Sequence, residues 1–206
     1  MTATSLERTA EIYRFWFGEP GDPGFVDGRE MWFKGGPDFD ETLRRNFLTD
    51  HQRAASGALD HWRDDWRGCL ALILLLDQFP RNMFRATPRS FASDSKAPGI
   101  ARHALDAGHT SGRHSVGKCI FYLPFEHSEA IEDQQCCVAL FEAQAPHKLR
   151  DDWINYAIEH RDIIARFGRF PYRNEIRGRQ STADEIAFLA ETGTNFGTAP
   201  HRAEPS

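Results

Sequence analysis

The chain has 206 residues, and its 30 acidic and 25 basic side chains give a formal net charge of −5 at pH 7. This mild acidity argues against nucleic acid or an anionic membrane as the main partner. The length suits one domain that buries a real hydrophobic core. The longest uninterrupted apolar run covers residues 69–76. It is far shorter than the roughly 18 residues that span a bilayer, so no membrane partner is expected.

The N-terminus and the cysteines indicate a cytoplasmic protein. The first residues have neither the basic start nor the apolar centre of a secretory signal. The cysteines are Cys69, Cys119, Cys136 and Cys137, and none of them forms a C-x-x-C pair. Few cysteines without a regular spacing are typical of thiols in a reducing compartment. We therefore expect a cytoplasmic location.

The first part of the chain predicts a capped helix and a short apolar plug. Thr4 and Glu7 have the spacing of a capping box, and the helix that they start is expected to end at Gly18. A loop rich in Gly, Pro and Asp follows. Trp32 and Phe33 then form a short element that we expect to fill the core.

The next segments predict a second helix and a buried rod. Asp38 and Glu41 form another capping-box pattern behind Pro37, and that helix is expected to end between residues 57 and 62. The rod covers residues 66–82 and is rich in leucine, which favours a helix over a central strand. A helix that is apolar on all sides is buried on all sides, so the rest of the chain should pack around it. Pro80 is predicted to end the rod.

Helix-breaking residues and the periodicity of apolar residues predict further helices after the rod. Their expected ranges are 94 or 97 to 105, 128–144, 149–167 and 182–191. Residues 119–125 are strongly apolar and are interpreted as a helical turn that enters Pro124. No segment alternates as a strand would. The sequence therefore predicts an all-α domain over residues 1–194, with a flexible tail over 195–206.

Three motifs carry a resemblance to a known family. They are L-A-L-I-L-L-L-D-Q-F-P-R-N, F-Y-L-P-F-E-H-S-E and R-D-I-I-A-R-F-G-R-F-P-Y-R-N, in this order along the chain. Together they resemble the mostly bacterial domain-of-unknown-function family nine-two-four. The resemblance implies a tetratricopeptide-like array of antiparallel helix pairs around a central buried helix. It implies no activity, and no catalytic residues can be carried over.

Asp77 stands near the C-terminal, negative end of the rod. A carboxylate there is unfavourable by about 0.3–1 kcal/mol, so a cation should compensate it. Arg81 is close in the sequence, and an arginine from the later F-P-Y-R-N segment is a second possibility. Such an ion pair is either part of a functional site or a structural contact that fixes the turn at the end of the rod.

The segment Glu126-His127-Ser128-Glu129 is the densest cluster of reactive side chains. His127 is a candidate acid or base, with Glu126 or Glu129 orienting its ring. Alternatively, Ser128 caps the following helix and the acids favour its first turn. The acids at 126, 129 and 133 share a helix face, but no histidine has the spacing of a metal-binding helix. Neither a metal site nor a cofactor is expected.

These side chains suggest one pocket, if the fold brings the motifs together. Its candidate members are Asp77, Arg81, Asn82, His127, Glu129, Arg173 and Asn174. Our first hypothesis is a helical module without enzymatic activity that binds a small anionic ligand or an acidic peptide end in a polar groove. The alternative is a small hydrolase or lyase with His127 as acid or base. The sequence leaves the oligomeric state open.

Overall fold

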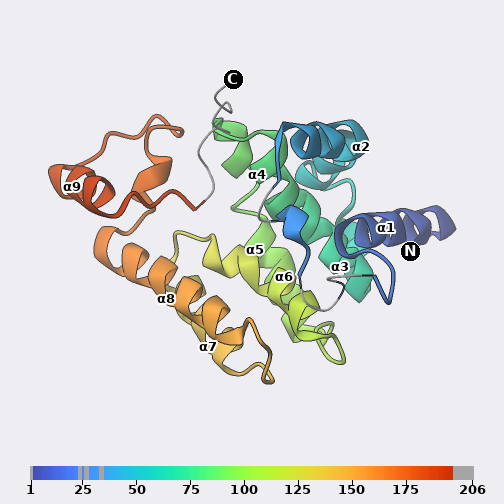
Figure 1. The fold of residues 1–206 in the computed structure, drawn as a ribbon. Coiled ribbons are helices and arrows are strands. Elements are labelled where there is room, and N and C mark those ends of the chain that lie inside the picture. The colour runs from blue at the N-terminus through green and yellow to red at the C-terminus, as the bar shows by residue number, and fades with distance from the viewer. Residues whose placement is uncertain (1, 23–24, 26–27, 33–34, 197–206) are drawn as a thin grey trace.

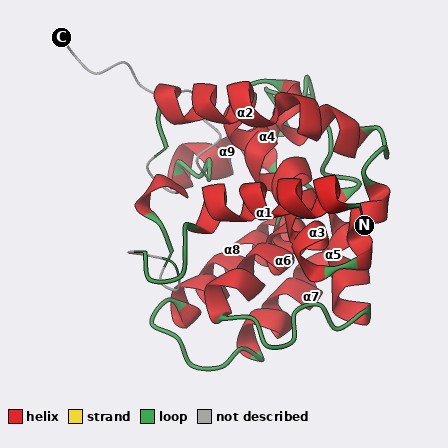
Figure 2. Cartoon of the chain, turned by 90° about the vertical axis from the view of Figure 1, so that its right-hand side faces the viewer, coloured by secondary structure: helices red, strands yellow, loops and turns green. Residues whose placement is uncertain are grey.

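The computed structural model describes residues 2–22, 25, 28–32 and 35–196. Phe33 of the expected plug and residues 197–206 of the expected tail lie outside the described residues. Within them the structure is helical and contains no strand, as predicted, and Figure 2 shows helices joined by loops. None of the described helices is long and apolar enough to cross a bilayer.

The α-helices are α1 (Ala3–Phe17), α2 (Pro37–Ala55), α3 (Trp66–Ile73), α4 (Phe79–Met83), α5 (Ala97–Asp106), α6 (Ser115–Glu126), α7 (Ile131–Glu142), α8 (Arg150–Phe167) and α9 (Ala183–Thr192). The shorter helical turns are η1 (Glu30–Trp32), η2 (Asp60–Asp64), η3 (Leu74–Gln78), η4 (Pro88–Phe91) and η5 (Pro171–Arg173). In Figure 1, α1 and α2 lie on one side of the molecule, α3 to α6 lie near its middle, and α8 and α9 lie on the other side. Close packing joins α7 to α8, α6 to α7, α2 to α4, and α3 to both α1 and α5.

The buried rod is the centre of the core, as predicted. No residue from 69 to 76 is more than 1% exposed. The burial of each Leu or Ile in this stretch stabilises the fold by about 1.5–3 kcal/mol. The rod therefore positions everything attached to its C-terminal end.

Pro80 does not end the rod, contrary to the prediction. The helix widens into the π turn η3 and continues as α4, with Pro80 in the first turn of α4. Proline supplies no N–H, so the wider turn leaves carbonyls free of helix partners. His51 Nδ1 donates to the Leu75 carbonyl at 2.8 Å, and the Ser93 hydroxyl donates to the Leu76 carbonyl at 2.5 Å. Side chains from other segments thus take over the missing helix bonds.

The two predicted capping boxes in the first part of the chain are wrong. The cap of α1 is Thr2, two residues before Thr4. Helix α2 begins at Pro37 and has no side-chain cap, so Asp38 lies inside its first turn. Proline is favoured at a helix start because its fixed φ suits the helix and its missing N–H would be unsatisfied there.

Later helix ends agree better with the sequence. Thr182 and Glu185 form both bonds of the predicted capping box, and Gly168 ends α8 in the left-handed conformation. Pro124, however, lies inside α6, which is a full helix rather than one turn. The alternative in which Ser128 caps the following helix is also wrong, because α7 begins at Ile131 and its N-cap position is Ala130.

Candidate functional site

The first and second sequence motifs meet at the carboxylate of Asp77, which is 1% exposed at the end of the π turn η3. The Nδ1 atom of His127, just after α6, lies 2.8 and 2.9 Å from the two carboxylate oxygens. Arg81, one turn further along the rod, donates to Asp77 at 2.9 Å, as predicted. The Gln78 amide donates to it at 2.6 Å.

Asp94 connects the third motif to this cluster. It accepts from Arg81 at 3.1 Å and from Arg173 at 3.2 Å. Arg173 is 1% exposed and also donates to the His127 carbonyl at 3.0 Å. The three motifs therefore converge, although Arg173 reaches Asp77 only through its neighbours. Sequence reasoning missed Asp94, which has no motif around it to mark it.

The charges of the cluster hold Asp77 ionised and His127 neutral. Burial opposes ionisation of Asp77, but the Arg81 charge and the hydrogen bonds from His127 and Arg81 hold its pKa well below its usual range. Burial and the Arg81 charge lower the pKa of His127 more than Asp77 raises it. A neutral imidazole that donates from Nδ1 to a carboxylate keeps a lone pair on Nε2. The side chain of His127 is 16% exposed, so most of it is shielded from solvent and a small part reaches it.

Two further buried groups lie near the dyad formed by Asp77 and His127. Burial and the Asp77 charge raise the pKa of Glu126 to about 8. Burial lowers the pKa of His160 to about 3, and its Nδ1 lies 2.8 Å from the Tyr156 carbonyl. His160 is therefore a neutral core residue.

Glu129 does not orient His127, contrary to the prediction, because the carboxylate that contacts the imidazole is Asp77. Glu129 instead accepts two bonds from Arg179, at 2.7 and 2.9 Å, and one from the Phe170 N–H at 2.9 Å. It thereby fastens the start of the F-P-Y-R-N segment to the loop before α7. The predicted acidic helix face is also wrong, because Glu126 ends α6, Glu129 lies in the loop and Asp133 is in α7. Arg102 donates to Asp133 at 2.8 Å.

The two asparagines of the predicted pocket lie in other networks. Asn82 donates to the Gln78 carbonyl at 3.2 Å and accepts from Arg85 at 2.7 Å. Asn174 donates to Ser181 at 3.1 Å and to Glu185 at 3.3 Å. The predicted constellation therefore divides into separate groups, with Asp77, Arg81, His127 and Arg173 in one of them.

A family model described as "Bacterial protein of unknown function (DUF924)" matches residues 12–193. The chain belongs to this family. It is also similar to a solved structure titled "Structure of Protein of Unknown Function ATU0120 from Agrobacterium tumefaciens", with 37% identity and a TM-score of 0.79. That match covers 91% of this chain and 99% of the other. A comparison with curated proteins gave no match.

This DUF924 chain has a surface pocket of about 810 Å³ between α2, α4 and η4. Its lining residues are Pro37, Asp40, Glu41, Arg44, Leu48, Asn82, Met83, Phe84, Arg85, Thr87, Pro88 and Arg89. Asn82 alone among the predicted site residues lines it. No pattern in the sequence indicates the pocket, because α2 lies far from α4 and η4 in the chain.

Proposed function

We propose that this protein is a helical binding module for a small ligand with one anionic group and an apolar body. The observation that carries the proposal is the 810 Å³ pocket with Arg89 on its wall. Its volume lies in the range of about 300–1,000 Å³ that small-molecule sites occupy. The apolar side chains of Leu48, Met83 and Phe84 would contact the body of the ligand.

The charges on the pocket wall leave Arg89 available for an anion. Arg85 pairs with Asp40 at 3.0 Å, and Arg44 pairs with Glu41. Among the described residues Arg89 has no carboxylate partner, and its guanidinium lies 3.8 Å from the centre of the Phe84 ring. A guanidinium stacked on a ring keeps its N–H edge free for two parallel bonds to a carboxylate or phosphate.

A strained residue stands between the two parts of this wall. Ala86 has a φ of 57°, in the left-handed region that a side chain other than glycine rarely adopts. The turn that contains it carries the chain from α4 to η4 and so sets where Arg85 and Arg89 lie. Strain of this kind persists where the surroundings hold it, and it is common at binding sites.

Arg81 and Arg173 are less suited to the ligand than the sequence suggested. Both guanidiniums already pair with Asp94, and Arg173 is buried. The anion-binding role proposed here therefore rests on Arg89, while Arg81 and Arg173 hold the dyad in place.

The experiment is a thermal-shift screen with small carboxylates, phosphorylated metabolites and short peptides. A ligand at about 100 times its Kd adds about 2.7 kcal/mol, which raises Tm by about 5–10 °C for a chain of this size. The Arg89→Ala variant should lose most of this rise. Arg67→Ala is the matched control, since Arg67 is also exposed and stacks on a ring, 4.7 Å from the centre of Trp66. A panel without any shift, or a shift that Arg89→Ala preserves, contradicts the proposal.

The dyad favours a second candidate function, a small hydrolase or lyase. A carboxylate that accepts from Nδ1 leaves Nε2 as a general base, which is the arrangement found in hydrolytic triads. The measurement is turnover of an ester and amide panel by the wild type and by His127→Gln. Activity that disappears in this variant and survives in Arg89→Ala would support catalysis at the dyad. Equal activity of the wild type and His127→Gln would rule it out.

A further inference from the structure

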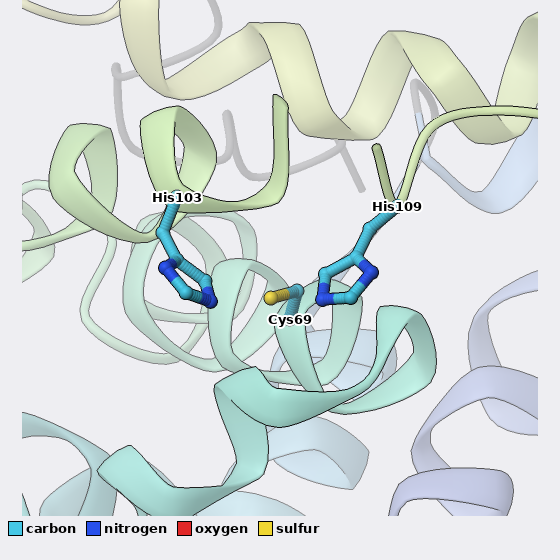
Figure 3. A group of neighbouring side chains, drawn as sticks. All are labelled: Cys69, His103 and His109. Carbon is cyan, nitrogen blue, oxygen red and sulfur yellow. The ribbon is translucent and has the colours of Figure 1, made fainter. Parts of the chain in front are cut away.

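Three side chains with metal-binding atoms converge at the start of α3, whereas the dyad lies beyond its C-terminal end. They are Cys69 in the first turn of α3, His103 in α5, and His109 in the loop after α5. One ligand atom from each lies within 4.8 Å of the other two. Figure 3 shows the two imidazole rings on either side of the Cys69 sulfur. Among the described residues this is the group of His, Cys, Asp and Glu side chains with the geometry for a metal ion.

The three ligand atoms surround one backbone oxygen, the carbonyl of Arg63 at the end of η2. The Cys69 sulfur lies 3.2 Å from it, and the Nε2 atoms of His103 and His109 lie 3.1 and 3.3 Å from it. A carbonyl oxygen has two lone pairs, so three donors exceed what it needs. Satisfying this carbonyl therefore does not by itself explain why three side chains gather around it.

These distances fit the edges of a coordination tetrahedron. Zinc bonds of about 2.0–2.3 Å to nitrogen, oxygen and sulfur place neighbouring ligand atoms about 3.3–3.6 Å apart. The three distances to the Arg63 oxygen are close to such edges. The remaining ligand pairs lie up to 4.8 Å apart, so the imidazoles must move inward by about 1 Å to bind a zinc ion.

We propose that Cys69, His103 and His109 bind one zinc ion, with the Arg63 carbonyl or a water as fourth ligand. A thiolate and two imidazoles are the ligand types that zinc prefers. Binding forms a zinc–sulfur bond, and the thiol proton passes to solvent. Cys69 is buried, while both histidines are partly exposed, so an ion can enter between the imidazoles. Gly108, with a φ of 71°, makes the turn that returns His109 toward His103.

The site has a clear consequence for the fold. The ion would add coordination bonds between η2, the start of α3 and the end of α5, three segments that the contacts to the Arg63 carbonyl already join. It is independent of the pocket at Arg89 and of the dyad. No sequence motif indicates this zinc site, because five residues separate the two histidines and the cysteine lies far upstream.

The test uses untagged protein, zinc titrated by calorimetry, and cobalt(II) as a spectroscopic probe. A thiolate bound to cobalt gives a ligand-to-metal absorption band, and tetrahedral cobalt gives strong visible bands. The ligand variants are Cys69→Ser, His103→Gln and His109→Gln. The matched controls are Cys136→Ser and His61→Gln, which change the same residue types outside the cluster.

We expect one zinc ion per chain and a cobalt–thiolate band in the wild type and in both controls. Loss of a residue that supports a ligand weakens binding by about 10–100-fold, so loss of a direct ligand should weaken it by more than about 100-fold. Because Cys69 is in the core, the two histidine variants keep the test valid if Cys69→Ser does not fold. Absence of zinc binding, or a cobalt band that survives in the His103→Gln and His109→Gln variants, would overturn the proposal.

Discussion

The buried carboxyl group of Glu126 makes the stability of this protein depend on pH in a predictable direction. Burial and the nearby Asp77 charge raise its pKa from 4.5 to about 8. The folded chain therefore binds more protons than the unfolded chain between these two values. The free energy of unfolding must fall as the pH rises through this window, because ionising Glu126 costs more in the fold than in the unfolded chain.

The Glu126→Gln variant removes this dependence. At about 1.4 kcal/mol for each pKa unit, the shift corresponds to up to about 5 kcal/mol. At about pH 5 the variant should be nearly as stable as the wild type, since glutamine resembles a protonated glutamate. At about pH 9 it should be the more stable of the two, by a few kcal/mol.

Urea denaturation of both proteins from about pH 5 to about pH 9 measures this difference. Glu132→Gln is the control, because Glu132 carries the same side chain at an exposed position of α7. The control should follow the wild type at every pH. A difference between Glu126→Gln and the wild type that stays constant across the range would refute the assignment of Glu126 as a neutral buried acid.

Other substitutions test the contacts that hold the site. Asp77→Asn should lower the free energy of unfolding by about 3–5 kcal/mol, because it removes the buried charge that pairs with Arg81. Urea denaturation at neutral pH measures the difference, and a decrease below about 1 kcal/mol would contradict the expectation. Gly68→Ala places a Cβ 1.8 Å from the Trp62 carbonyl oxygen, so we expect the free energy of unfolding to fall by at least about 3 kcal/mol. An unchanged midpoint of urea denaturation would contradict this expectation. Thr182→Ala removes the cap of α9 and should lower the free energy of unfolding by about 1 kcal/mol. Calorimetry should show this as a Tm decrease of about 2–4 °C. An equal Tm would show that the cap contributes nothing to stability.

Local signals were reliable where the chain itself supplies the partner. The capping box of Thr182 and Glu185 and the glycine end of α8 are built from bonds within a few residues, and both were predictable. The same kind of signal failed at Thr4 and Asp38. There a competing cap at Thr2 and a proline at the helix start satisfy the same backbone groups.

Pro80 shows why local reasoning fails inside the core. A proline ends an isolated helix because a carbonyl loses its partner. Here His51 and Ser93, from two other segments, bond to the freed carbonyls, and the helix continues. The sequence does not contain the information that these two side chains arrive at that point.

Composition and periodicity by themselves determined the all-helical class and the central buried rod, because burial of apolar surface depends on which residues are present and in what pattern. The motifs also identified four candidate site residues, Asp77, Arg81, His127 and Arg173. Only the tertiary structure decided that Asp77 rather than Glu129 binds His127, and that Asp94 joins the two arginines. The pocket at Arg89 and the cluster at Cys69 are also recognisable only in the tertiary structure. Their members are brought together by packing between helices distant in the chain, which no spacing along the sequence encodes.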